Sequence, residues 1–140
     1  MKKKAALKTI YIFSCISVFL PWFTYNAKMM GYCWGFRFIP MLFVPLLLTG
    51  IFTFSCKHRD LFAVLAEISS AINIVILIFI FGRWQQYSNI IAGFQWADGF
   101  RTATPAYWLS ALQFLLLFIF VQIVSIADRH NKSCSREAAG

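Results

Sequence analysis

Four long apolar runs restrict what this chain can fold into. They cover about residues 5–23, 38–56, 61–81 and 106–127. Each run is close to the roughly 20 residues that an α-helix needs to cross a bilayer, and is far longer than the ~10 residues of a membrane strand. The runs therefore predict an all-α polytopic membrane protein, in which residues 1–140 form a single bundle of four transmembrane helices.

The overall composition agrees with lipid as the surrounding medium. Hydrophobic residues make up 60% of the 140 residues and charged residues 13%, whereas globular domains average about 45–50% apolar and about 25% charged residues. A soluble chain of this length cannot bury so much apolar surface, because small domains leave a large fraction exposed. We therefore expect an integral protein of the cell membrane (inner or plasma membrane), with the lipid bilayer as its first partner.

The basic residues set the expected orientation. Nine Lys and Arg residues lie on one side of the four runs, and four lie on the other side in longer loops. The positive-inside rule therefore places both termini (1–4 and 128–140) and the turn 57–60 in the cytoplasm, and the loops 24–37 and 82–105 outside. The net charge of +8 could instead indicate nucleic acid. These short clusters form no continuous basic face, so we expect no nucleic-acid partner.

Two features affect the first and second runs. A cleaved signal peptide is the rival interpretation of the first run, but a cut after Ala27 would put the bulky Tyr25 at the −3 position, which favours retention as a helix. In the second run, Pro40 lies in the first turn, where its missing N–H does no harm. Pro45 lies one turn deeper and should kink or loosen the helix.

Polar residues inside the runs are the first candidate site. Counting 1.5 Å per residue from the cytoplasmic end, Glu67 lies about 9 Å deep and Asn73 about 18 Å deep. In the antiparallel fourth run, Gln122 and Gln113 fall at about 8 Å and 21 Å. We therefore expect Glu67 to lie opposite Gln122, and Asn73 opposite Gln113. Small and polar residues at helical spacing predict a seam on one face of the third run, made of Ala66, Ser69, Ser70 and Asn73.

Glu67 has two interpretations. An acid inside the membrane is a candidate proton or cation site. The structural alternative is that Glu67 holds helices together, or meets Lys57 or Arg59 near the inner surface, because its depth leaves it within reach of the interface.

Tryptophans in the expected outer loops are the second candidate site: Trp34, Trp84 and Trp96. Such residues commonly form an aromatic belt at the membrane–water interface. The alternative is a cap that docks a partner or a lipid-like ligand, because exposed aromatic surface often marks a binding site. The stretch "NIIAGFQWADGF" also predicts a short interfacial helix, broken by Gly99.

Catalytic and cofactor chemistry finds no support in the residues. His58 and His130 have no third ligand at metal spacing, and the apolar runs contain no histidine that could bind haem. Paired carboxylates, a Ser–His–Asp set, a phosphate-binding glycine loop and a Cys-x-x-Cys motif are also missing from the sequence. We therefore expect no enzymatic activity, no metal and no cofactor.

Two motifs resemble a known group of proteins. "FLPWFTY" at the end of the first run and "PAYWLSALQFLLLF" at the start of the last resemble small bacterial four-span membrane proteins with a Leu-Pro-Trp motif and no assigned function. The resemblance covers the whole layout and implies a four-helix fold.

Two functions follow from these observations. The first is a non-enzymatic bundle that binds another membrane protein or a second copy of itself, as an accessory subunit or an immunity-type protein. The alternative is a small oligomeric transporter or channel that uses the polar residues within the membrane. A membrane enzyme acting on lipid is the third class, and it lacks a catalytic set.

Overall fold

The computed structural model describes residues 2–24, 31–55, 60–84 and 95–137. The described chain is mostly helical, as expected. Its elements, in chain order, are helix α1 (Lys2–Ser17), strands β1 (Pro21–Thr24) and β2 (Tyr32–Trp34), the 3-10 helix η1 (Gly35–Phe38), and helices α2 (Ile39–Phe54), α3 (Asp60–Arg83), α4 (Trp96–Thr102) and α5 (Pro105–Glu137).

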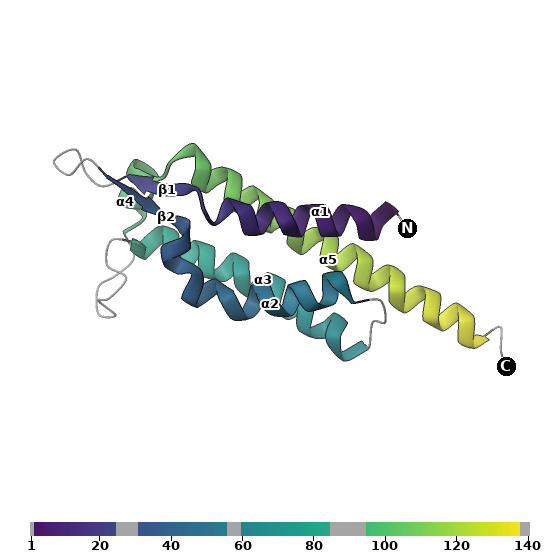
Figure 1. The fold of residues 1–140 in the computed structure, drawn as a ribbon. Helices are drawn as coiled ribbons and strands as arrows, with labels where there is room; N and C mark the ends of the chain where they lie inside the picture. The colour runs from purple at the N-terminus through teal and green to yellow at the C-terminus, as the bar shows by residue number, and fades with distance from the viewer. Residues whose placement is uncertain (1, 25–30, 56–59, 85–94, 138–140) are drawn as a thin grey trace.

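The four longer helices lie side by side (Figure 1). Helix α1 packs against α5 and α2, and α3 packs against α2 and α5. Both chain termini lie at one end of the bundle, and the β1–β2 hairpin and α4 lie at the other end. We call these the terminal end and the cap end. Successive long helices therefore run in opposite directions, so the chain begins and ends at the terminal end.

Among the described residues, three helical segments are long and apolar enough to cross a membrane: Gly35–Phe54, Leu61–Arg83 and Pro105–His130. The expected count of four spans is not confirmed, because α1 has 16 residues, or roughly 24 Å of helix against a hydrocarbon core of ~30 Å. The first helix was expected to reach residue 23, and it ends at Ser17. Pro21 accounts for the early end, since proline disfavours helical backbone in the residue before it and cannot donate to the preceding turn.

The described parts of the segment expected to be the second outer loop, residues 82–84 and 95–105, are largely structured. Helix α3 continues to Arg83, α4 follows later, and Ala103 forms a β-bridge with Phe23. Gly99 does not break the short helix but lies within α4 and is buried. A Cβ atom at Gly99 would lie 2.6 Å from the Phe81 carbonyl oxygen, so glycine allows α4 to pack directly on α3. The earlier part of the predicted interfacial helix, residues 85–94, lies outside the described residues.

Helix α5 extends well past the expected end at residue 127. Pro105 begins it, at a position where a missing N–H costs nothing. Its last turns carry polar and charged residues, including Asp128, which pairs with Lys4 of α1 at 3.2 Å. The helix therefore continues beyond its apolar part.

Candidate functional site

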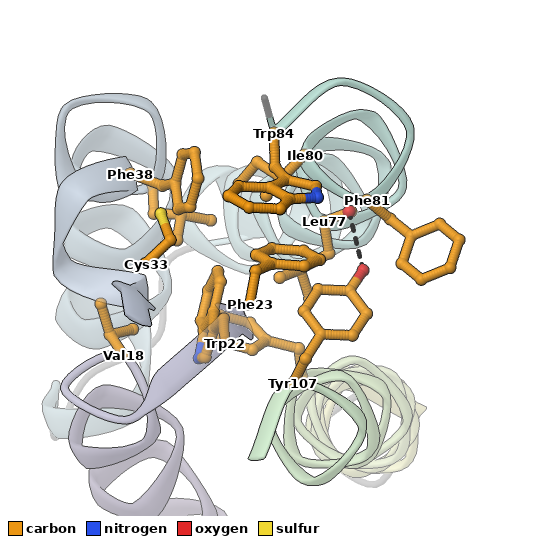
Figure 2. Packing of buried hydrophobic residues seen from close by; sticks show 12 residues of the cluster. Val18, Trp22, Phe23, Cys33, Phe38, Leu77, Ile80, Phe81, Trp84 and Tyr107 are labelled. Atoms are coloured by element: carbon orange, nitrogen blue, oxygen red, sulfur yellow. Dashed lines mark hydrogen bonds between the residues drawn. The ribbon is translucent and has the colours of Figure 1, made fainter. Parts of the chain in front are cut away.

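The cap end is closed by a cluster of buried aromatic side chains (Figure 2). Phe23 of β1 lies at its centre, stacked on Trp84 with ring centroids 4.8 Å apart and planes 6° apart. Tyr107 of α5 contacts Phe23 at 4.9 Å between centroids. Trp22 stacks on Phe38 of η1 at 6.0 Å. Four segments that are distant in sequence therefore meet in one aromatic core.

Hydrogen bonds hold these rings in fixed positions. Trp22 Nε1 donates to the Ser17 carbonyl at 3.0 Å, where α1 ends. Tyr107 OH donates to the Leu77 carbonyl of α3 at 2.9 Å, the bond drawn in Figure 2. A buried aromatic ring whose polar atom is paired has one favoured orientation. The cap is therefore a built structure with defined side-chain positions.

Backbone and hydroxyl contacts join the cap segments to one another. Thr104 N donates to the Trp22 carbonyl at 2.9 Å, and Thr24 Oγ1 donates to the Thr102 carbonyl at 3.2 Å. Trp84 Nε1 donates to Thr102 Oγ1 at 2.8 Å. These bonds tie β1 to the last residue of α4 and to the segment that follows it, and they tie the end of α4 to Trp84, which directly follows α3.

The three tryptophans that the sequence singled out are in different environments. Trp84 is 4% exposed and belongs to the cap core, so we remove it from the candidate docking residues. Trp34 and Trp96 are 44% and 48% exposed. The exposed aromatic residues near them form two groups, which we call the cap aromatics: Tyr32, Trp34 and Phe36 on β2 and η1, and Trp96 and Phe100 on α4.

Sequence reasoning missed the role of Trp22 and Phe23. It placed Trp22 at a helix end and gave Phe23 no role, although both are completely buried. The signal that could have revealed them is the proline directly before them. Pro21 ends the helical stretch, and residues after such a break belong to a different element with its own packing.

Glu67 forms the second candidate site, at the terminal end. Its Oε1 atom accepts hydrogen bonds from Ser125 Oγ and from Arg129 Nη2, the latter at 2.5 Å. Both partners lie on α5, which confirms α5 as the neighbour of α3 but replaces the expected partner Gln122. Lys57 and Arg59, the other expected partners, lie outside the described residues. Glu67 thus joins α3 to α5 by a hydroxyl and an ion pair.

Asn73 lies in the middle of the bundle. It is 1% exposed, and neither Nδ2 nor Oδ1 has a hydrogen-bond partner among the described residues. The expected pairing with Gln113 is therefore not formed. Instead, the main-chain carbonyl of Gln113 accepts from Ser14 Oγ of α1 at 3.4 Å. The predicted seam is confirmed as a buried face, since all four of its residues, Ala66, Ser69, Ser70 and Asn73, are at most 3% exposed.

Several other buried hydroxyl groups bond to the backbone of their own helices. Thr49 Oγ1 donates to the Pro45 carbonyl and Thr53 Oγ1 to the Thr49 carbonyl, both at 2.8 Å. Ser110 Oγ donates to the Ala106 carbonyl at 2.9 Å. These donors are therefore occupied. Within the part of the chain that the structure describes, no group of three or more His, Cys, Asp or Glu residues could hold a metal ion.

Fold and site together define a class: a helical chain that is closed at one end by an aromatic cap and whose described part holds three helical segments long and apolar enough to cross a membrane. No family model, curated protein or solved structure matches the sequence or the fold.

Proposed function

We propose that this chain is a four-span integral membrane protein without enzymatic activity that binds another membrane protein through the cap aromatics. In this role it acts as an accessory subunit or an immunity-type protein. The termini lie in the cytoplasm and the cap lies outside, which is the orientation that the basic residues favour.

The outer face of α1 supports a fourth span. Ile12, Phe13 and Ile16 of α1, and Phe19 just after the helix, are each 48–61% exposed. Such a row of large apolar side chains is stable in lipid but costly in water. The opposite face of α1 packs against α5. The residues after Ser17 continue into the cap. They therefore add length to the roughly 24 Å of α1, and the added length helps this part of the chain to cross the bilayer.

The cap aromatics support partner binding. The rings of Trp34 and Phe36 lie 6.5 Å apart between centroids, on the segment that also carries Cys33 and Phe38 of the buried core. Aromatic side chains held on a preorganised base lose little entropy on binding, and tryptophan and tyrosine are common hot-spot residues in interfaces. The single observation that carries the proposal is this exposure of large aromatic rings on a cap whose own core is already complete.

Site-specific photo-crosslinking in native membranes tests the proposal. A photoreactive amino acid at position 34 or 96 should give a discrete crosslinked band with a second membrane protein. The matched control is position 43, because Phe43 is also an exposed aromatic residue, 57% exposed, and lies on α2 among residues expected to face lipid. Trp34→Ala and Trp96→Ala should weaken co-purification of that protein. Equal crosslinking at all three positions, or co-purification unchanged in both variants, would count against the proposal.

A small oligomeric transporter or channel is the second candidate function. The observation that favours it is Asn73, a polar group with unused hydrogen-bonding capacity at the centre of the bundle. Glu67 would then act as an inner site for a proton or cation. In liposomes, Glu67→Gln should abolish coupled flux while the protein remains folded. If the wild-type protein carries no flux of protons, sodium or potassium, this candidate is rejected.

A further inference from the structure

We propose that the bundle binds one internal water molecule between α2 and α3, held by the Asn73 side chain and the main-chain carbonyl of Met41. The inference is independent of the cap and of any partner. It starts from Asn73, whose amide is buried and makes no hydrogen bond within the described chain. An unpaired buried amide destabilises a protein, and native structures pair nearly all such groups with protein or with ordered water.

Pro45 supplies the second polar group. It lies inside α2, and because proline has no N–H, the carbonyl of Met41 lacks the donor that the residue four positions later normally provides. Two other carbonyls of this turn receive hydroxyl groups. Thr49 donates to the Pro45 carbonyl at 2.8 Å, and Tyr11 of α1 donates to the Leu46 carbonyl at 3.1 Å. The Met41 carbonyl is therefore the group of the proline turn that most needs a donor from outside the helix.

Helix geometry places Met41 and Asn73 at the same depth. Met41 precedes the last residue of α2, Phe54, by thirteen positions, and Asn73 follows the first residue of α3, Asp60, by thirteen positions. At 1.5 Å per residue, both lie roughly 20 Å from the terminal end of the bundle. The two helices pack against each other along their length (Figure 1).

The two groups also lie on facing sides of these helices. Ile74 lines a groove between α3 and α5, and Asn73 is one residue, about 100°, round α3 from it. Leu46 lines a groove between α2 and α1, and Pro45 is likewise about 100° round α2 from it. Because Asn73 and Pro45 are both buried, each points toward the remaining neighbour rather than toward lipid. That neighbour is α2 for Asn73 and α3 for Pro45.

Water fits this pair of groups better than a cation does. A water molecule can accept from Asn73 Nδ2 and donate to the Met41 carbonyl, so it satisfies one donor and one acceptor. A monovalent cation would bind Oδ1 and the carbonyl but would leave Nδ2 without an acceptor. Glu67, the acid on the same helix, is engaged by Arg129. Ordered water is a known way to satisfy proline-broken turns in transmembrane helices, and internal waters usually make about three hydrogen bonds.

Water-edited solid-state NMR of the wild-type protein in lipid bilayers tests the site directly. Asparagine and leucine are labelled with ¹⁵N. The Asn73 side-chain signal is identified by its loss in Asn73→Leu, and the Leu117 backbone signal by its loss in Leu117→Ile. We expect this amide to receive magnetisation from water at short mixing times. The backbone amide of Leu117, which is fully buried, serves as the dry control. An Asn73 signal that builds up as slowly as that of Leu117 would overturn the proposal.

A double-mutant cycle provides the second test. Asn73→Leu should lower the unfolding temperature, because it removes the water's anchor and leaves the Met41 carbonyl unpaired. Pro45→Ala restores a helical N–H for that carbonyl, so in this background Asn73→Leu should lower the unfolding temperature less. Strictly additive shifts, or a rise in unfolding temperature with Asn73→Leu alone, would show that Asn73 and the proline turn share no ligand.

Discussion

Glu67 of α3 and Arg129 of α5 form an ion pair, with Oε1 and Nη2 separated by 2.5 Å. The same carboxylate oxygen accepts the hydroxyl of Ser125, which lies one helical turn before Arg129 and so projects from the same face of α5. The pair lies toward the terminal end of the bundle. An acid within an apolar helix is thus paired with an arginine whose side chain is 48% exposed.

Separating Glu67 from Arg129 should cost little stability. We expect Arg129→Gln to lower the free energy of unfolding by no more than about 1 kcal/mol, because half-exposed ion pairs are screened by solvent. A double-mutant cycle with Glu67→Gln should give a coupling energy that shrinks as salt is added. Thermal unfolding in detergent at low and high salt measures both quantities. A coupling of several kcal/mol that does not respond to salt would indicate a dry, fully buried pair instead.

The cap core should carry far more stability than the cap aromatics. Phe23→Ala removes a completely buried ring and is expected to cost about 3–5 kcal/mol, the usual range for large core truncations. Phe36→Ala removes a ring that is 49% exposed and should change stability by less than about 1 kcal/mol. Unfolding temperatures of the two variants provide the comparison. Equal effects would mean that Phe36 is buried in the protein in its membrane.

Gly99 should be required for α4 to dock. A Cβ atom there would lie 2.6 Å from the Phe81 carbonyl and 2.8 Å from its ring, so Gly99→Ala should push α4 away from α3. We expect faster hydrogen exchange of α4 amides and of the Trp84 indole N–H, which bonds to Thr102. Ala97→Ser, at an exposed position of the same helix, is the matched control and should leave exchange unchanged. Unaltered exchange in Gly99→Ala would mean that α4 is not packed as described.

The extent to which the sequence predicts this structure varies with the kind of interaction. The apolar runs place α2 and α3 almost to the residue, because length and hydrophobicity alone determine such helices in lipid. The buried seam on α3 is also predicted, since it follows from helical periodicity.

The partners and the cap are harder to predict for physical reasons. Ser125 and Gln122 lie at similar depths on α5, and only the rotation of that helix decides which one meets Glu67. The cap depends on contacts between residues far apart in sequence, such as Phe23 with Trp84 and Tyr107. Pro21 signals only that Trp22 and Phe23 leave the helix. For Trp84 no local pattern distinguishes a tryptophan in such a core from one in an interfacial belt.

The most direct test of the four-span arrangement is the sidedness of α1. Single cysteines are placed at Lys3, Ala97 and His130 in a chain whose four native cysteines are replaced by serine, and intact cells are treated with a membrane-impermeant maleimide. The four-span arrangement predicts labelling of Ala97→Cys in intact cells, and labelling of Lys3→Cys and His130→Cys only after the membrane is permeabilised. Labelling of Lys3→Cys in intact cells, with His130→Cys still protected, would place the N-terminus on the side of the cap and contradict a fourth span.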